Sequence, residues 1–218
     1  EELSEINTSD LRDTLTQGLD ETGFIVLNDG DVDFAEENSS VVHSADYYVP
    51  HIAHAPLEPV NSTAYVTETN CTVWLPTQAP SFVRQTASDI TGLSKDDVIV
   101  HPTLLGGSFG RKVGTDYVDQ VVRIAMQVDR PVTLIWSREE DVRRDQFRPT
   151  FTGRIIGGLS DEGRLSFIKS VNCGDSVLGF GKADPLSVEG LNDTAYEIEH
   201  QRCAHVYKKF PIIIGQWR

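Results

Sequence analysis

The pattern of hydrophobic and polar positions is most regular between residues 62 and 137. Over 80–91 and 116–128 the apolar residues recur every three to four positions, the spacing of an amphipathic helix. Strand-forming residues precede, separate and follow these two stretches, at 62–75, 97–101 and 131–136. The pattern predicts an α+β fold: a mixed sheet with crossover helices, in the order strand, helix, strand, helix, strand. Because the last strand is apolar on both faces, we expect it in the sheet interior.

The regions that flank this block are less regular. Leucines at positions 11, 15 and 19 predict a helix, and residues 23–27 predict a strand. Residues 31–40 are acidic and are expected to form a loop, whereas 151–156 and 164–171 predict a β-hairpin. Residues 174–204 look loop-rich. We therefore expect two regions: residues 1–45, a helix and strand with an acidic connector, and residues 46–218, the main domain.

Both ends of the chain look cut. It begins at Glu1 without a methionine and stops in an apolar run at 212–218, whereas domain ends are usually polar and mobile. The expectation is an internal piece of a longer protein, with the domain at 46–218 truncated at its C-terminus.

Composition limits the possible functions. The 19 basic and 33 acidic residues leave a net charge of −14, which argues against a nucleic-acid partner, because phosphate binding needs clustered lysine and arginine. No apolar run is long enough to span a membrane. Cys71, Cys173 and Cys203 lie far apart without a Cys-x-x-Cys pair, so they are expected to be buried apolar residues and not metal ligands.

The strongest local motif is Leu-Gly-Gly-Ser-Phe-Gly-Arg-Lys at 105–112, between a predicted strand and a predicted helix. Glycines allow a ligand to approach the backbone, amides at a helix N-terminus favour an anion, and Arg111 and Lys112 add positive charge. The spacing matches neither of the two common nucleotide-binding glycine motifs. From these residues alone, a ligand loop and a plain turn are equally good interpretations.

Two further groups allow a chemical and a structural interpretation. His54 and Glu58 have the spacing of helical zinc ligands, but Pro56 and Pro59 disfavour a helix, so structural hydrogen bonding is the better hypothesis. The charged run at 138–144 could supply a catalytic carboxylate, but an ion-paired helix start is favoured.

Several ordered motifs resemble the xanthine dehydrogenase and aldehyde oxidase family of molybdenum hydroxylases, and within it the isoquinoline 1-oxidoreductase branch. The resemblance is carried by His-Ala-Pro-Leu-Glu-Pro at 54–59, Val-Trp-Leu-Pro-Thr-Gln at 73–78, Gly-Gly-Ser-Phe-Gly-Arg at 106–111 and Gly-Gln-Trp-Arg at 215–218. It runs from about residue 47 to the C-terminus and implies the molybdenum cofactor-binding domain of that family.

The resemblance implies roles for particular residues in binding the molybdopterin cofactor. Gln78 would hydrogen-bond to an oxygen ligand of the molybdenum, and the backbone around Phe109 and Gly110 would lie against the cofactor. The same loop contributes Gly106, Gly107 and Arg111. Arg218 would face the substrate. Without the resemblance, a loop-end glutamine, a core phenylalanine and a solvated terminal arginine would be the simpler interpretations.

The resemblance also implies a reaction and a partner. Enzymes of this family hydroxylate an N-heterocycle or oxidise an aldehyde with water as the oxygen source, and pass the electrons to a separate iron–sulfur small subunit. The glutamate that acts as base lies beyond the segment present here, so the chain alone is expected to be inactive and to hold no cofactor. Val113 stands where the purine-oxidising enzymes have a glutamate, which argues against a purine substrate.

Two expectations remain open at this stage. The branch is often exported, which implies a periplasmic parent protein. A non-enzymatic binding or scaffold module that shares the fold is the competing function.

Overall fold

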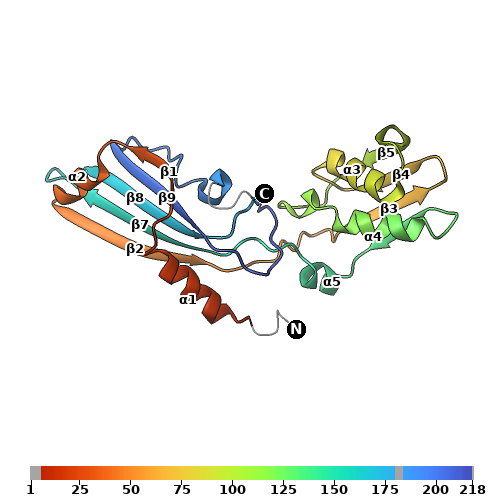
Figure 1. Ribbon diagram of the computed structural model, residues 1–218, viewed down its shortest axis with the longest axis horizontal. Coiled ribbons are helices and arrows are strands. Elements are labelled where there is room, and N and C mark those ends of the chain that lie inside the picture. Colours follow the sequence, from red (N-terminus) through yellow and green to blue (C-terminus); the bar gives the residue numbers. More distant parts are fainter. Residues whose placement is uncertain (1–5, 180–183, 218) are drawn as a thin grey trace. The chain divides into compact units, whose positions relative to one another are not determined.

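The computed structural model describes residues 6–179 and 184–217. The chain divides into two compact units (Figure 1): unit 1 contains Glu1–Ile52 and Pro149–Ile212, and unit 2 contains Ala53–Arg148 and Ile213–Arg218. Each unit has its own sheet. This division differs from the boundary expected at residue 45, because early strands of the chain pair with late ones.

Unit 1 is built on a five-stranded sheet in the order β1-β9-β8-β7-β2. Its strands are β1 (Phe24–Asp29), β2 (Val41–Val49), β7 (Phe151–Leu159), β8 (Leu165–Gly174) and β9 (His200–Tyr207). Only the β8–β9 pair is parallel; the other three pairs are antiparallel. The predicted hairpin at 151–171 is confirmed as β7 and β8.

Two helices pack on one face of this sheet. Helix α1 (Thr8–Gly18) buries Leu15 against Cys173 and Val206, which are directly opposite each other on β8 and β9. Helix α2 (Val32–Glu37) buries Val32 and Ala35 against Phe167. A short 3-10 helix, η5 (Pro185–Val188), contacts β8 and β9. The helix predicted from the three leucines is therefore confirmed, and its N-cap is Asn7.

Unit 2 contains a four-stranded sheet in the order β5-β4-β3-β6. Its strands are β3 (Asn61–Val66), β4 (Cys71–Leu75), β5 (Val98–Pro102) and β6 (Val132–Ile135). Its helices are α3 (Pro80–Thr91), α4 (Asp116–Ala125) and α5 (Arg138–Arg143), and its 3-10 helices are η2 (Lys95–Asp97) and η3 (Arg111–Val113). The order β4, α3, β5, α4, β6 confirms the predicted block, and the strand-forming stretch 62–75 folds as an antiparallel pair, β3 and β4.

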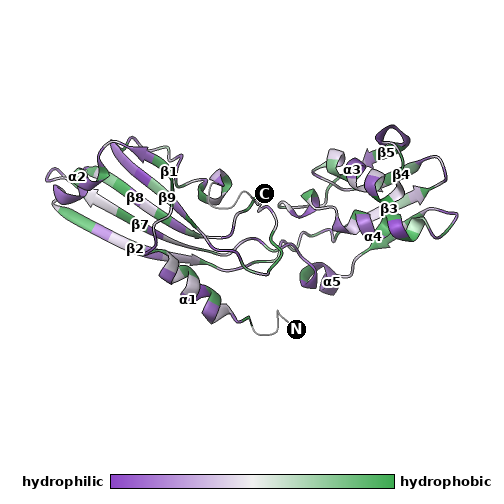
Figure 2. Ribbon diagram, in the orientation of Figure 1, coloured by the Kyte–Doolittle hydropathy of each residue, from purple (hydrophilic) through white to green (hydrophobic). Residues whose placement is uncertain are grey.

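The core of unit 2 lies between this sheet and the two longer helices. Hydrophobic and hydrophilic residues are interspersed along α4 (Figure 2), and helical spacing places Val118, Val121, Val122 and Ala125 on one buried face. Helix α3 contributes Val83 and Ala87 to the same cluster. The amphipathic stripes predicted the packing faces of both helices correctly.

Three sequence expectations are wrong. Strand β6 is an edge strand and not an interior one; Ile135 is 68% exposed, because β6 pairs with β3 alone. The acidic segment 31–40 contains α2, which begins where the Asp31 side chain accepts from the Phe34 amide. Strands β2 and β9 were not predicted; β2 is an exposed edge without an apolar stripe, and β9 lies in the segment expected to be loop-rich.

Leu75 and Leu104 provide a test of this core. Leu75 is 1% exposed beneath the helices and Leu104 is 94% exposed. Leu75→Ala should lower the free energy of unfolding by about 2–5 kcal/mol, because it leaves a cavity. Leu104→Ala should change it by less than about 0.5 kcal/mol. Denaturant unfolding of both variants checks this, and equal effects would contradict the described packing.

Candidate functional site

The candidate site lies at one edge of the unit 2 sheet. Strands β4 and β5 are parallel, so their C-terminal ends meet at the same edge. Gln78 follows β4, and the loop 103–110 follows β5 and leads into η3. The Thr103 amide donates to the Leu75 carbonyl at 2.9 Å, which holds the start of the loop against the end of β4.

The Gln78 side chain is fixed by the loop that it faces. Its Oε1 atom accepts from the Gly110 amide at 3.1 Å and from the Ser108 hydroxyl, and its backbone amide donates to the Lys112 carbonyl at 3.0 Å. Two donors on Oε1 determine which way the amide group points. The Nε2 group of this exposed side chain then has no acceptor among the described residues and remains available to donate to a ligand. Gln78 and the 106–111 loop therefore lie at the same edge of the sheet, where both can contact one ligand.

The backbone of the loop has an unusual conformation at three nearby positions. Gly107, Phe109 and Gly110 have φ values of 95°, 55° and 101°, in the left-handed region that a phenylalanine rarely adopts. The amides of residues 107–109 donate to no acceptor in the part of the chain that the structure describes. The Phe109 side chain is 53% exposed. The loop therefore combines amide donors that have no partner among the described residues with one exposed aromatic ring, which favours the ligand-loop interpretation over a plain turn.

Glu58 and Lys112 hold the base of the loop. Lys112 is buried, and its Nζ lies 2.5 Å from Oε2 of Glu58, which also accepts from the Gly106 amide at 2.9 Å. Partial burial opposes ionisation of Glu58, but the hydrogen bonds from Lys112 and Gly106 outweigh it and hold the pKa of Glu58 below its ordinary value. The Glu58 carboxylate thus joins the 54–59 segment to the loop.

Arg111 is also committed to internal partners. Its side chain is buried, and both terminal nitrogens donate to Asp116, at 2.9 and 2.7 Å. Its Nε lies 2.9 Å from Oδ1 of Asp145, and its guanidinium carbon lies 5.5 Å from the centre of the Trp136 ring. The expectation that Arg111 and Lys112 offer positive charge to an anionic ligand is wrong, because carboxylates neutralise both. A cofactor-binding role for the Arg111 side chain has no support in this geometry.

His54 contacts Asp145, the carboxylate that also pairs with Arg111. Its Nδ1 lies 3.2 Å from both carboxylate oxygens of Asp145, and its Nε2 lies 2.6 Å from the Gln216 carbonyl oxygen. Burial opposes ionisation of Asp145, but hydrogen bonds from His54 and the charge of Arg111 keep its pKa below the ordinary value. Among the described residues no group of three or more potential metal ligands occurs. His54 and Glu58 thus make the internal hydrogen bonds that the structural hypothesis predicts.

The charged run after β6 forms the short helix α5. Ser137 caps it by accepting from the Glu140 amide, and Arg138 pairs with Asp141 at 2.5 Å. Arg138 also donates to the carbonyl of Leu57 at 3.0 Å, which links α5 to the 54–59 segment. Burial raises the pKa of Asp141 against the opposing charge of Arg138. The ion-paired helix start is confirmed over the catalytic-carboxylate alternative.

The C-terminal arginine and the three cysteines were the other residues singled out in the sequence. Arg218, the expected substrate-facing residue, lies outside the described residues. The three cysteines are buried and free, and burial raises the thiol pKa of Cys71 to about 11 and of Cys173 to about 12. Thiols with such pKa values are poor nucleophiles near neutral pH, in agreement with the expected apolar role. No described helix has the length and hydropathy needed to cross a bilayer.

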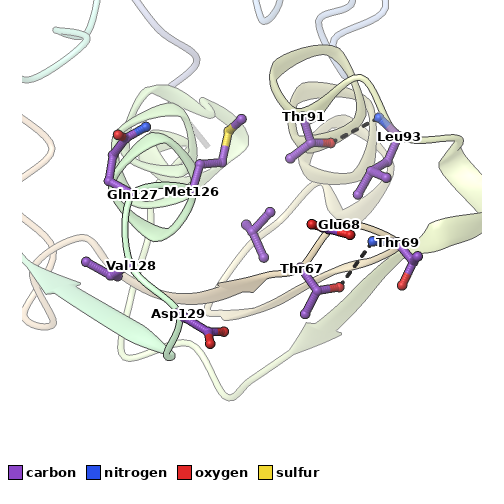
Figure 3. Close-up of a pocket in the computed structure, with 10 residues that line it drawn as sticks. Thr67, Glu68, Thr69, Thr91, Leu93, Met126, Gln127, Val128 and Asp129 are labelled. Carbon is purple, nitrogen blue, oxygen red and sulfur yellow. Dashed lines mark hydrogen bonds between the residues drawn. The ribbon is translucent and has the colours of Figure 1, made fainter.

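A cavity of about 810 Å³ lies in unit 2 away from the Gln78 loop. The β3–β4 turn, the end of α3 and the residues after α4 surround it (Figure 3). Thr69 precedes β4, whereas Gln78 follows it, so this cavity opens at the other edge of the sheet. None of the predicted site residues lines it, and we do not assign the site to it.

The edge formed by Gln78 and the glycine loop has the features of a cofactor-binding α+β domain: exposed amide donors on a rigid base. Residues 18–208 match the molybdopterin cofactor-binding domain family, so the chain belongs to that family. Gln78 and all the loop residues lie within this match.

The chain is also similar in sequence to subunits of known oxidoreductases. It is 28% identical over 129 residues to the isoquinoline 1-oxidoreductase subunit beta of Brevundimonas diminuta, covering 58% of this chain and 16% of that protein. It is 26% identical over 151 residues to the nicotinate dehydrogenase large molybdopterin subunit of Eubacterium barkeri, covering 69% and 36% respectively. The chain thus spans only a small part of these relatives.

A solved structure shows the same fold. The aldehyde oxidoreductase from Desulfovibrio gigas superposes with a TM-score of 0.72 at 20% identity, over 90% of this chain and 22% of that one. This likeness supports the mixed α+β architecture expected from the sequence.

Gly106 tests the contact at the base of the loop. A Cβ atom there would lie 2.5 Å from Cβ of Glu58, so Gly106→Ala must displace either the loop or Glu58. We expect a loss of about 1–3 kcal/mol in the free energy of unfolding and faster amide hydrogen exchange in residues 106–112. Gly153→Ala is a suitable control, because its nearest contact would be 3.7 Å away. Unchanged exchange in the Gly106 variant would show that the loop does not depend on this contact.

Glu58 predicts a dependence of stability on pH. Because the folded protein holds the pKa of Glu58 below its ordinary value, its ionised form stabilises the fold. That stabilisation is present above about pH 4.3, the unfolded value, and is lost as pH falls through the lower folded pKa. Glu58→Gln should therefore be less stable than wild type near pH 7, and the difference should shrink below about pH 4. A constant difference from pH 7 to pH 3 would contradict this.

Proposed function

We propose that this chain is the part of a molybdenum hydroxylase that binds the molybdopterin cofactor, and that the whole protein hydroxylates an N-heterocycle or oxidises an aldehyde with water. One observation carries the proposal: Gln78 and the 106–110 loop meet at one sheet edge, with the Gln78 amide group and three loop amides left as donors. Membership of the molybdopterin cofactor-binding family supports it.

The donor set fits the cofactor. Molybdopterin bears anionic and carbonyl-type oxygen atoms, and uncommitted amide N–H groups bind such atoms without adding a charge of their own. Gln78 Nε2 and the amides of residues 107–109 would donate to these oxygens, and the exposed Phe109 ring would cover an apolar part of the group. When bound, the cofactor supplies the oxidation–reduction chemistry.

In the proposed function, the residues of this chain have different roles in binding the cofactor and the substrate. Gln78 orients the cofactor, and Gly107 and Gly110 allow close approach of the backbone. Arg111 and Lys112 keep the loop rigid from below and do not touch the ligand. Arg218 faces the substrate on the strength of the family resemblance, and the base that activates water comes from another part of the protein.

The names of the relatives span N-heterocycles, including the purine xanthine, and aldehydes. They include an isoquinoline oxidoreductase and a nicotinate dehydrogenase, and a structural neighbour is an aldehyde oxidoreductase. Val113 replaces the glutamate that the purine-oxidising enzymes carry after the loop, so an N-heterocycle other than a purine, or an aldehyde, is preferred.

The remaining parts of the proposal concern the whole protein. An iron–sulfur small subunit would accept the electrons, and the parent protein would be periplasmic, both by analogy with the isoquinoline 1-oxidoreductase branch. A non-enzymatic module that shares the fold is the alternative, and absence of molybdenum from the complete protein would favour it.

Gln78→Leu in the complete protein tests the proposal. Loss of a hydrogen bond to a charged ligand, worth about 1.5–3 kcal/mol, should weaken cofactor binding at least about tenfold. We expect less molybdenum per protein by elemental analysis and lower turnover of an N-heterocycle or aldehyde. Gln127→Leu, a change of the same chemistry beside the distant cavity, should keep both at wild-type values. A Gln78→Leu protein with wild-type molybdenum content and turnover would overturn the assigned role.

A further inference from the structure

The hydrogen bonds of His54 determine how many protons its ring carries. Nε2 faces the Gln216 carbonyl oxygen at 2.6 Å, and Nδ1 faces both oxygens of Asp145 at 3.2 Å. The His54 side chain is buried, so water does not mediate these contacts. Both nitrogens of the ring therefore meet oxygen atoms of the protein directly.

Each of these oxygen atoms can act only as an acceptor. A peptide carbonyl has no proton to give, and neither has an ionised carboxylate. Asp145 is ionised, because its carboxyl also accepts from the His54 backbone amide and lies 2.9 Å from Nε of Arg111. A neutral imidazole has one N–H and would leave its second nitrogen lone pair facing an acceptor.

We propose that His54 is a buried imidazolium and a positioning residue, which holds the segment 213–217 against residues 145–147 through hydrogen bonds donated to Asp145 and to the Gln216 carbonyl. Two backbone hydrogen bonds join the same two segments. Ile213 O accepts from the Phe147 amide at 3.0 Å, and the Gly215 amide donates to Phe147 O at 2.9 Å. His54 adds a charged donor at the Gln216 carbonyl, further along the segment.

Charge balance supports a cationic His54. Asp145 faces His54 and Arg111, and Arg111 also pairs with Asp116. With His54 protonated, two cations meet two carboxylates in this cluster. A neutral His54 would leave one negative charge in excess at a largely buried site, next to the further carboxylate Asp141, whose own partner is Arg138.

The consequence for the active site rests on the proposed function. The segment 213–217 leads directly to Arg218, the residue that the family resemblance turns toward the substrate. His54 would then set the direction of the chain at Arg218 without touching the substrate. The protonation state of His54 can be measured independently of any molybdenum chemistry, so failure of this inference and failure of the proposed function are distinguishable.

Nitrogen-15 NMR of the histidine rings of the full chain at pH 7 tests the protonation state. His54 should show two protonated ring nitrogens. His205 is an internal control: its Nδ1 donates to the Asn172 carbonyl, its buried Nε2 has no partner among the described residues, and burial lowers its pKa. His205 should show one bare nitrogen, and His54→Gln and His205→Gln assign the two signals. A bare ring nitrogen on His54 at pH 7 would overturn the proposal.

Two variants test the positioning role. Asp145→Asn replaces the ionised partner with a neutral amide, so the His54 ring should become neutral and show a bare nitrogen. His54→Phe keeps a ring but removes both donors, and the Gly215 amide should exchange at least about tenfold faster while Val73 in β4 keeps its protection. Equal acceleration at both amides would mean that His54 supports global stability only. If either variant fails to fold, the wild-type spectrum still decides the protonation state.

Discussion

The structure of the site depends on one constraint: two cationic side chains are buried under the glycine loop, and each must meet a carboxylate. An unpaired buried charge costs several kcal/mol, so the fold has to bring acidic residues from elsewhere in the sequence to this place. Glu58 serves Lys112, and Asp116 and Asp145 serve Arg111. These carboxylates lie on three separate segments of unit 2. Pairing them therefore fixes the positions of those segments and of the loop at the same time.

This arrangement gives the loop an inner and an outer side with different chemistry. The charged side chains of η3 are buried and neutralised, whereas the Phe109 ring is exposed and the amides of residues 107–109 have no acceptor among the described residues. In the proposed function, an anionic ligand would be recognised by oriented backbone dipoles and not by mobile cations. Gly107 and Gly110 have positive φ values and no Cβ atom, so the backbone there leaves room for a ligand to approach closely.

The sequence predicted the parts of the fold that follow from local periodicity. The apolar stripes on α3 and α4 identified their buried faces. Gln78 and the glycine loop each follow a predicted strand, and the structure brings them together where these two parallel strands end. Edge or interior position could not be predicted for β6, because Ile135 is apolar although exposed. Strand β2 was missed for a related reason: its partner β7 begins more than 100 residues later, and its exposed side chains leave no alternating pattern. Pairing with residues far away in the sequence determines whether such strands form and where they lie in the sheet, and a single sequence does not reveal that pairing.

The roles of the charged residues were the least predictable part of the site. Arg111 and Lys112 follow a glycine loop, where a cation would suit an anionic ligand, and no local feature distinguishes that use from a buried ion pair. Arg111 is committed to an internal ion pair by Asp145, which lies 34 positions further along the chain and contacts both Arg111 and His54. Because one carboxylate serves both cations, the loop base and the segment that ends the chain are not independent. A change in the charge of either cation alters what Asp145 offers the other, so the geometry on the two sides of Asp145 is coupled through that single group.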